Sequence, residues 1–534
     1  MMKKVFEFNE DQKEAINSVK PKILCLAGAG AGKTACLVNR VHRIATEQNS
    51  GDSILVLTFT NAAAFEMSGR YKKLTTKNLP LFCTFHAFCY RTIVKDPRVL
   101  HAIGYFKIPS IATDSQIRRI VVQCSAALKL KLSEKSATKL ISETNSNLSS
   151  DFKLFQKMAR KELVKQNIIS FDLLSNLVCQ LFVSDAEVVR KYKCQYKYIF
   201  VDEFQDTDNT QWQFVQSFEP YKANLFVVGD ALQALYAFRG ADSRIIKALS
   251  NNEEWHRIKL KHNYRSTRQI CDYANNFAKS YASEEYRVEM QTEKSGAEVT
   301  KTDISDNQFS SVSALEKILP DIQDTEKTCA ILVSTNKEVA EIKQQLDSAK
   351  ILYASNSISK DIINLLNSVL SDDTALSWLS SLLPNDKFIQ YIQVSTIDNI
   401  SLTKFANIYK DIYPINLYYN KIMRIRRYRD KPSGMAIASS IASLLGLNMI
   451  IPVSDDAKFE EIINQIIKMC EEREQCRIYV GTIHSSKGLE YDDVAVCGVD
   501  SYSFRLSRED KNNMYYVACT RAKSRLTIVY GDVI

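Results

Sequence analysis

Residues 23–34 read Ile-Leu-Cys-Leu-Ala-Gly-Ala-Gly-Ala-Gly-Lys-Thr, and residues 35–47 continue with a helical pattern. A short apolar strand, a loop of small residues and the start of a helix therefore follow one another. Small residues let successive backbone N–H groups face a chain of phosphates, and the helix N-terminus adds a positive partial charge. The stretch predicts a P-loop that binds a nucleoside triphosphate.

The loop also ends on two side chains with a defined chemistry. In this pattern Lys33 reaches the β- and γ-phosphates, and the Thr34 hydroxyl ligates Mg²⁺. The pattern starts with glycine, whereas this chain has alanine at position 27. That change leaves the expected loop geometry intact. The residues expected to hold the phosphates through their backbone are Ala27, Gly28, Ala29, Gly30, Ala31 and Gly32.

A second motif supplies the carboxylates that hydrolysis of the triphosphate needs. Residues 198–203 read Tyr-Ile-Phe-Val-Asp-Glu, which places an acidic pair at the C-terminal end of a buried strand. Open α/β sheets bind ligands at this end of their strands. We expect Asp202 to hold Mg²⁺, directly or through water, and Glu203 to polarise the attacking water as general base. The two motifs together indicate NTP hydrolysis, but not the work that it drives.

The composition is that of a large globular protein. The chain has 534 residues, of which 45% are apolar and 25% are charged. At about 150 residues per domain, this length predicts roughly three to four domains. A disordered chain, a collagen-like rod and a disulfide miniprotein are excluded. The net charge of +9 permits a nucleic-acid partner without demanding one.

The thiols and the apolar segments indicate a cytoplasmic protein. The 13 cysteines include no Cys-x-x-Cys pair, and the six histidines form no cluster with them. We therefore expect reduced thiols and no structural zinc. The N-terminus lacks the apolar core of a signal peptide. Residues 432–454 carry no charge, but their serines favour a packed helix and a short strand over a membrane span.

Short apolar runs alternate with helical stretches along the chain, as parallel sheets with crossover helices require. We expect strands at residues 23–26, 54–58, 198–201, 225–228, 330–333, 494–496 and 526–529. Residues from about 96 to 170 and from about 385 to 475 break this rhythm and are predicted to be helical. The expected fold class is α/β, with two parallel-sheet cores that are each interrupted by a mostly helical insertion.

Residues 202–207, Asp-Glu-Phe-Gln-Asp-Thr, resemble motif II of the UvrD/Rep-type superfamily 1 DNA helicases. Further blocks resemble other motifs in the family's order: residues 9–15 the Q-motif, 57–61 motif Ia, 84–86 motif Ib, 228–241 motif III, 263–267 motif IV, 482–490 motif V and 516–522 motif VI. The resemblance spans residues 9–530 and fails only in the two insertions. It implies an ATP- and Mg²⁺-dependent helicase that moves 3′→5′ on single-stranded DNA and at single-strand/duplex junctions.

The resemblance also assigns domains to the chain. It implies a first RecA-like motor domain at residues 1–95 and 171–263, a helical insertion at 96–170, a second RecA-like motor domain at 264–384 and 476–534, and a reduced helical, basic insertion at 385–475.

Three further residues are implied to hold the nucleoside. Gln12 is expected to pair bidentately with the adenine edge, as glutamine does in nucleic-acid recognition. Tyr264 would stack on the adenine ring, and Glu490 would accept hydrogen bonds from the ribose. The family usually has an arginine after the P-loop threonine, whereas this chain has Ala35, which puts base selectivity in question.

The resemblance implies that motifs III, IV and VI surround the γ-phosphate. Arg265 and Arg521 would act as arginine fingers from the second motor domain and stabilise the charge of the transition state. Gln233 would sense the γ-phosphate and link it to the DNA-facing part of motif III. With Lys33 and Glu203, these three side chains make up the expected catalytic set.

The single strand is expected to contact residues of motifs Ia, Ib, III and V. Stacking of a base on an aromatic side chain contributes about 1–3 kcal/mol, and polar contacts to the DNA backbone carry no sequence information. A lone aromatic is more often a core residue, so only its place in a motif favours a stacking role. The expected DNA-binding residues are Phe59, Thr60, Asn61, His86, Tyr236, Phe238, Arg239 and His484.

Several departures from the family leave alternatives open. Ala62 and Ser334 replace a usual lysine and a usual arginine, which weakens the expected DNA contacts. The short second insertion is typical of motors that work with a partner, such as a nuclease or a Gabija-type anti-phage system. The basic run at residues 421–431 fits duplex phosphates, an acidic partner or a solvated helix face equally well.

The alternative to a helicase is a nucleic-acid-gated ATPase switch, or the regulatory subunit of a nuclease or anti-phage complex, with little unwinding of its own. A non-catalytic scaffold is a further alternative, against which the intact Lys33, Glu203, Arg265 and Arg521 argue. An RNA substrate also stays open, because stacking and backbone contacts separate DNA from RNA only weakly.

Overall fold

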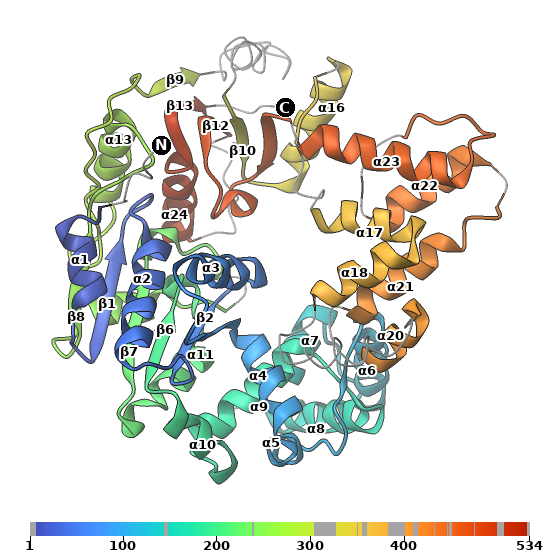
Figure 1. Ribbon diagram of the computed structural model, residues 1–534, viewed down its shortest axis with the longest axis horizontal. Coiled ribbons are helices and arrows are strands. Elements are labelled where there is room, and N and C mark those ends of the chain that lie inside the picture. Colours follow the sequence, from blue (N-terminus) through green and yellow to red (C-terminus); the bar gives the residue numbers. More distant parts are fainter. Residues whose placement is uncertain are drawn as a thin grey trace. The chain divides into compact units, whose positions relative to one another are not determined.

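The computed structural model describes residues 7–143, 148–237, 240–303, 327–349, 351–354, 360–382, 401–409, 415–431, 433–445, 447, 451–474, 476–498 and 507–530. The chain divides into two compact units (Figure 1). The first unit comprises Met1–Val299 and Ser503–Arg525, and the second comprises Thr300–Tyr502 and Leu526–Ile534. Residues 264–299 and 507–525, assigned above to the second motor domain, thus pack with the first unit. The predicted motor-domain boundaries stay a prediction.

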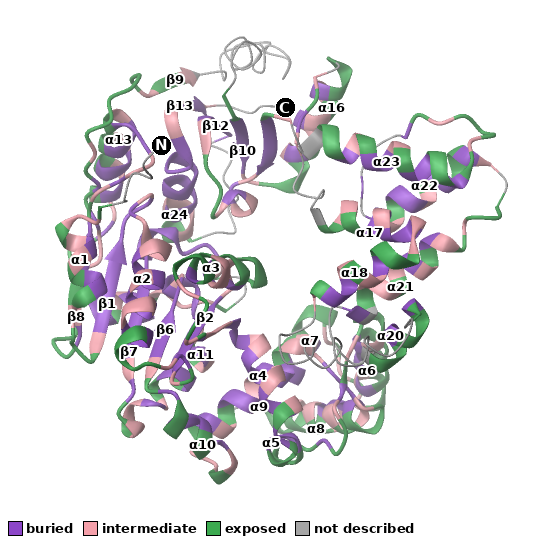
Figure 2. Ribbon diagram, viewed as in Figure 1, coloured by how far each residue is buried: buried purple, intermediate pink, exposed green. Residues whose placement is uncertain are grey.

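A six-stranded sheet forms the centre of the first unit, in the order β3-β2-β6-β7-β1-β8. All neighbouring strands in it are parallel. Its strands are β1 (Lys22–Ala27), β2 (Ile54–Thr58), β3 (Leu81–Thr84), β6 (Tyr198–Val201), β7 (Asn224–Gly229) and β8 (His256–Leu260). The central strands are buried along nearly their whole length (Figure 2), as sheets covered on both faces require. Because the strands are parallel, all their carboxyl ends lie at one edge.

Helices cover this sheet because their apolar residues recur at helical spacing. In α2 (Lys33–Glu47), Leu37, Val41 and Ile44 are buried in one cluster with residues of the strands. The other helices of the first unit outside the insertion are α1 (Glu10–Asn17), α3 (Asn61–Leu74), α4 (Phe85–Lys95), α9 (Phe171–Val183), α10 (Glu187–Gln195), α11 (Asn209–Gln216), α12 (Ser243–Ser250), α13 (Arg268–Lys279) and α24 (Arg508–Cys519).

The first insertion is mostly helical, as predicted, but not entirely so. It contains α5 (Pro97–Ala102), α6 (Asp114–Ala127), α7 (Glu134–Ser142) and α8 (Ser150–Lys165). Two short strands, β4 (Ser110–Ile111) and β5 (Ile168–Ile169), pair in parallel within it. The prediction of an all-helical segment is wrong at these four residues. A strand of two residues forms only because it pairs with a segment distant in sequence, and it is too short to show an alternation of apolar and polar residues.

A five-stranded sheet in the order β11-β10-β12-β13-β9 forms the centre of the second unit. Its strands are β9 (Thr300–Asp303), β10 (Cys329–Val333), β11 (Ile478–Thr482), β12 (Tyr491–Cys497) and β13 (Ala522–Tyr530). Strand β10 is parallel to both β11 and β12, and β13 is parallel to β9. Helix α16 (Asn336–Ser348) buries Val339, Ile342 and Leu346 in the core of this sheet.

A helical cluster with its own apolar core completes the second unit. Its helices are α17 (Lys360–Leu370), α18 (Asp372–Ser381), α20 (Leu402–Tyr409), α21 (Ile415–Arg426), α22 (Gly434–Leu445) and α23 (Phe459–Glu474). Helix α22 is the packed helix predicted in the uncharged segment, and part of the short strand expected after it lies outside the described residues. Across the described part of the chain, no helix has the length and apolarity that a membrane crossing needs.

The structure confirms the α/β fold class with parallel sheets, and each predicted strand lies inside an observed one. Four strands of the two large sheets were not predicted: β3, β8, β9 and β11. All four are edge strands. An edge strand has a neighbour on one side only, so its sequence need not be a continuous apolar run. Strand β8, for example, reads His-Arg-Ile-Lys-Leu and buries only Ile258 and Leu260.

Candidate active site

The loop between β1 and α2 has the geometry that its small residues predict. Gly30 and Gly32 adopt left-handed backbone conformations, with φ of +68° and +79°, which glycine reaches without steric cost. Gly32 is also the N-cap residue of α2. The Lys33 ammonium donates hydrogen bonds to the backbone oxygens of Ala27 (3.3 Å) and Gly28 (3.4 Å). The lysine thus lies against its own loop.

A segment more than 230 residues later in the sequence holds this loop in place. The Asn263 side chain donates to Ala29 O (2.8 Å), and the backbone N–H of Tyr264 donates to Gly30 O (3.0 Å). Asn263 Oδ1 in turn accepts from the N–H groups of Arg265 and Ser266, both at 2.7 Å. Asn263 therefore positions Arg265 beside the loop. No role was predicted for this asparagine, although it lies in the block that resembles motif IV.

Gly30 is needed for this close packing as well as for its backbone conformation. A Cβ atom at position 30 would lie 2.7 Å from Arg265 Cβ and 2.8 Å from Asn263 Oδ1. Both separations are shorter than van der Waals contact allows. The loop and the arginine segment can therefore approach each other only because position 30 has no side chain.

The acidic pair lies at the carboxyl edge of the same sheet, at the end of β6. Asp202 is 3% exposed, and its Oδ1 has no hydrogen-bond partner in the structure. Burial, reinforced by the neighbouring charge of Glu203, raises the pKa of Asp202 to about 7. Glu203 has a left-handed backbone with φ of +50°, a strained conformation that is typical of functional sites.

The unpartnered oxygen of Asp202 fits a cation ligand. A buried carboxylate oxygen without a donor is costly unless a positive charge compensates it. Among the described residues there is no group of three or more His, Cys, Asp or Glu side chains that could hold a metal alone. Mg²⁺ sites of nucleotide enzymes use one or two carboxylates together with substrate phosphates, and the single carboxylate of Asp202 is compatible with such a site.

Motifs III and VI meet through buried polar side chains. The Gln233 amide, in the short helix η3 (Ala231–Gln233), donates to Asp230 Oδ2 (2.7 Å). Its oxygen accepts from Arg521 Nη2 (3.1 Å). Arg521 also donates from Nε to Val517 O (3.0 Å) within α24. Asp230, Gln233 and Arg521 are each at most 5% exposed, so this network is fixed by the protein interior.

The two predicted arginine fingers lie close enough to influence each other. Arg265 Nη1 donates to Thr520 O (3.1 Å), the residue before Arg521. Burial, and then the positive charge of Arg265, lower the pKa of Arg521 to about 9. A negatively charged group bound at this place would offset both the burial of the Arg521 charge and its repulsion by Arg265. The structure thus brings Arg265 and Arg521 together within the first unit.

The predicted nucleoside residues split between the two units. Gln12 and Tyr264 are in contact, because the Tyr264 hydroxyl donates to Gln12 Oε1 (3.1 Å). Gln12 also closes the capping box of α1 with Asn9 and donates to Ala31 O (3.2 Å). Its side chain therefore joins α1 to the P-loop. Glu490 is exposed and belongs to the second unit.

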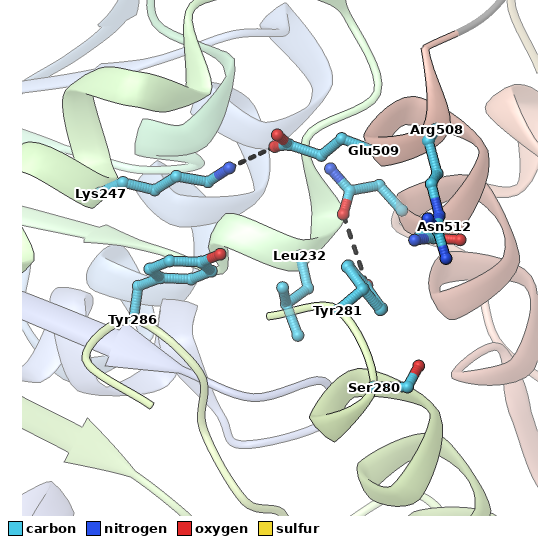
Figure 3. A pocket seen from close by; sticks show the side chains of 9 residues that line it. Leu232, Lys247, Ser280, Tyr281, Tyr286, Arg508, Glu509 and Asn512 are labelled. Carbon is cyan, nitrogen blue, oxygen red and sulfur yellow. Dashed lines mark hydrogen bonds and ion pairs between the residues drawn. The ribbon is translucent and has the colours of Figure 1, made fainter. Parts of the chain in front are cut away.

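Helix α24, which ends beside Arg521, is anchored to the first unit around a small cavity of about 370 Å³ (Figure 3). Glu509 forms an ion pair with Lys247 of α12 across the cavity. Asn513 donates to Ala234 O (3.3 Å) and accepts from the Tyr281 hydroxyl (3.4 Å). No P-loop residue lines this cavity, so its walls position α24 and do not form the phosphate site.

Five predicted DNA-binding residues follow carboxyl ends of strands in the first unit. Phe59, Thr60 and Asn61 follow β2, His86 follows β3, and Tyr236 follows β7 and η3. His484 is in the short helix η5 (His484–Ser486) of the second unit. Phe238 and Arg239 lie outside the described residues.

The Thr60 and His86 side chains each have a structural partner. The Thr60 hydroxyl caps α3 by accepting from Ala63 N–H (3.1 Å). His86 lies with Nε2 3.6 Å from Asp172 Oδ1 and edge-on to Phe171. Phe59 is half-buried and Asn61 is exposed.

Comparisons with known proteins identify the family of this chain. The family model described as UvrD/REP helicase N-terminal domain matches residues 8–254, and the model described as UvrD-like helicase C-terminal domain matches residues 258–532. The chain belongs to the UvrD/REP helicase family. The predicted family and its helicase class of enzyme are confirmed.

Curated relatives resemble this UvrD/REP family member over nearly its whole length. A probable DNA helicase II homolog of Mycoplasma capricolum subsp. capricolum is 26% identical, over 98% of this chain and 84% of the relative. The ATP-dependent DNA helicase PcrA of Staphylococcus epidermidis is 26% identical, over 98% of this chain and 83% of the relative. PcrA of Leuconostoc citreum is 29% identical, over 65% of this chain and 49% of the relative.

Proposed function

We propose that this chain hydrolyses ATP with Mg²⁺ and uses the energy to move along single-stranded DNA in the 3′→5′ direction. One observation carries the hydrolysis part: the P-loop lysine, the acidic pair and two arginines belong to one compact unit, around one sheet edge. The relatives named DNA helicase II and ATP-dependent DNA helicase PcrA support the substrate and the nucleotide.

In this proposal the phosphates bind on the backbone of residues 28–32, and Lys33 turns from the loop oxygens to the β- and γ-phosphates. Glu203 holds and polarises the attacking water. Arg265 and Arg521 neutralise the charge that develops on the γ-phosphoryl group, for which such fingers contribute large rate factors. Gln233 reports the state of that group to the rest of motif III.

Asp202 and Thr34 would hold Mg²⁺, which neutralises phosphate charge and orients the transferred group when bound. The unpartnered Asp202 oxygen supports this assignment. Gln12 and Tyr264 would hold the adenine. Because Gln12 Oε1 already accepts from Tyr264, bidentate pairing with the base requires these two side chains to exchange that bond for bonds to the nucleotide.

The single strand would run along the residues that follow β2, β3 and β7, with Phe59 and Tyr236 as stacking surfaces. Phe238, Arg239 and His484 complete the proposed track, and Glu490 completes the proposed nucleotide site. Alternating contacts of these residues during ATP turnover would produce movement. The 3′→5′ direction rests on the family alone.

The protein is proposed to work in the cytoplasm. All 13 cysteines are free thiols, 11 of them buried, as expected of a protein from a reducing compartment. A nuclease or another protein partner also stays a proposal, and it rests on the short second insertion.

The decisive experiment is steady-state ATP hydrolysis with and without an oligo(dT) strand, in Mg²⁺ and in EDTA. The wild type is compared with Lys33→Ala and with Lys153→Ala, a control at an exposed lysine of α8. The proposal requires Mg²⁺-dependent turnover that DNA stimulates at least tenfold and that only Lys33→Ala abolishes. Turnover that DNA does not change would reject DNA-driven movement.

A strand-displacement assay then tests the direction of movement and whether ATP hydrolysis drives unwinding of duplex DNA. Duplexes with a 3′ tail and with a 5′ tail are offered at equal concentration. Unwinding of the 3′-tailed duplex alone agrees with the proposal, and unwinding of the 5′-tailed one reverses the direction. DNA-stimulated turnover without displacement would favour an ATPase switch or a regulatory subunit.

A further inference from the structure

We propose that Gln205 is a positioning residue that couples the general base Glu203 to the γ-phosphate sensor Gln233 and to Arg521. The proposal rests on the proposed ATP hydrolysis and adds a residue to it. Gln205 would touch neither nucleotide nor DNA. It would act by holding Glu203 in register with the phosphate-sensing groups.

Both ends of the Gln205 amide are occupied, and each by a different part of the site. Its Nε2 donates to Glu203 Oε2. Its Oε1 accepts from the backbone N–H of Asp230 (3.0 Å). The side chain thus spans from the strand end of β6 to the strand end of β7. A carboxylate can only accept and an N–H can only donate, so the amide has one possible orientation.

From Asp230 the hydrogen bonds continue without a gap to the arginine. Asp230 Oδ2 accepts from Gln233 Nε2 (2.7 Å), and Gln233 Oε1 accepts from Arg521 Nη2 (3.1 Å). The chain of contacts therefore runs from Glu203 through Gln205, Asp230 and Gln233 to Arg521. Its two ends are the groups that would act on the water and on the γ-phosphate.

The surroundings of this hydrogen-bonded series, from Glu203 to Arg521, leave its side chains little freedom to move. Gln205 is fully buried, and Asp230, Gln233 and Arg521 are each at most 5% exposed. A Cβ atom at Gly229 would lie only 2.5 Å from Gln205 Oε1, so the glycine makes room for the amide. Buried polar networks of this kind are rigid when every member is satisfied. A shift of Gln233 toward or away from a phosphate is thus passed to Glu203.

The alternative is a purely structural role, in which the buried Gln205 amide only links the end of β6 to the end of β7. The two roles predict different results. A purely structural amide affects the melting temperature and leaves the turnover of the folded enzyme intact. A positioning residue changes kcat and leaves the KM for ATP nearly unchanged, because it acts on the reacting groups and not on nucleotide binding.

The test uses Gln205→Met, which keeps the side-chain length and removes both hydrogen bonds, and Gln205→Glu, which keeps the acceptor for Asp230 N–H but replaces the donor to Glu203 by a negatively charged oxygen. The control is Gln211→Glu: this glutamine is also buried, but it closes the capping box of α11 with Asp208, a position where glutamate serves equally well. We expect both Gln205 variants to lose at least 20-fold in DNA-stimulated kcat, with KM changed less than threefold. The control should match the wild type.

A double-mutant cycle with Gln233→Met shows whether Gln205 and Gln233 act through one connected series of hydrogen bonds or through two independent contacts. If the hydrogen-bonded series acts as a unit, the kcat of the double variant falls no more than threefold below that of the slower single variant. Multiplying losses would overturn the coupling, and wild-type kcat in Gln205→Met would overturn the role altogether.

Three further outcomes are informative. If Gln205→Met does not fold, Gly229→Ala displaces the amide without changing any polar group, and the same loss of kcat is expected. A wild-type enzyme that does not hydrolyse ATP would overturn the proposed function and this inference together. An active wild type with an unaffected Gln205→Met variant would overturn this inference alone.

Discussion

Replacing Gly30 by alanine tests whether the P-loop and the Arg265 segment work as one packed unit. The substitution has two separable costs. A residue with a side chain loses about 1–2 kcal/mol in the left-handed conformation that Gly30 adopts at φ +68°. The new Cβ would also lie 2.7 Å from Arg265 Cβ, about 0.8 Å inside ordinary carbon–carbon contact.

The second cost predicts the loss of activity. Arg265 or the loop must move by roughly the missing distance, and a misplacement of about 1 Å at reacting groups costs on the order of 100-fold in rate. We therefore expect Gly30→Ala to lower the kcat for ATP about 100-fold. Its melting temperature should fall by a few degrees, at about 2–4 °C per kcal/mol for a domain of this size.

Gly104→Ala is the matched control. Gly104 also has a left-handed backbone, with φ of +90°, but a Cβ atom there would meet nothing within 4 Å. This variant should lose similar stability and keep wild-type ATP hydrolysis, measured by steady-state kinetics beside thermal unfolding. The reasoning is refuted if Gly30→Ala hydrolyses ATP at the wild-type rate, or if Gly104→Ala is equally inactive.

Three further predictions concern charge, stacking and pH. Arg521→Lys keeps the charge but loses the fork of donors, so kcat should fall at least 100-fold; steady-state kinetics with a normal rate would contradict the finger role. Phe59→Ala should raise the DNA concentration for half-maximal ATPase stimulation at least fivefold, the lower end of one lost stacking contact; an unchanged DNA titration would make Phe59 a core residue only. Burial alone would raise the pKa of Asp96, but hydrogen bonds from Arg98 and Lys191 outweigh it and hold that pKa at about 2. Because this folded-state pKa lies below the unfolded value of about 3.9, the ion pairs stabilise the fold above pH 4 and lose this effect as the pH falls toward 2. The melting-temperature difference between wild type and Asp96→Asn should therefore be full at pH 5 and shrink toward pH 2, and a difference independent of pH would disprove the ion pairs.

Family and chemistry could be predicted from the sequence because the motifs are local. The P-loop needs consecutive small residues between a strand and a helix, and the acidic pair needs a buried apolar strand before it. Both requirements act within about a dozen neighbouring positions. The central strands were predictable for the same reason, since burial on both faces demands uninterrupted apolar runs.

The contacts that position the site residues were not predictable, because they join stretches of chain that are far apart in sequence. Asn263 holds a loop 234 residues away, and Gln233 meets Arg521 at a separation of 288 residues. Gln205 stands inside a recognised motif, yet nothing in its neighbours says that its amide spans to Asp230. Which donor meets which acceptor depends on the packing of elements that are distant in sequence.

The sequence alone determined the family, the fold class, the central strands and the residue types of the nucleotide site, because each depends on neighbours along the chain. Only the tertiary structure decided the edge strands, the β4–β5 pair and the hydrogen bonds from Glu203 to Arg521. These depend on which surfaces meet after folding. A pairing of that kind leaves no period and no motif in the sequence of either partner.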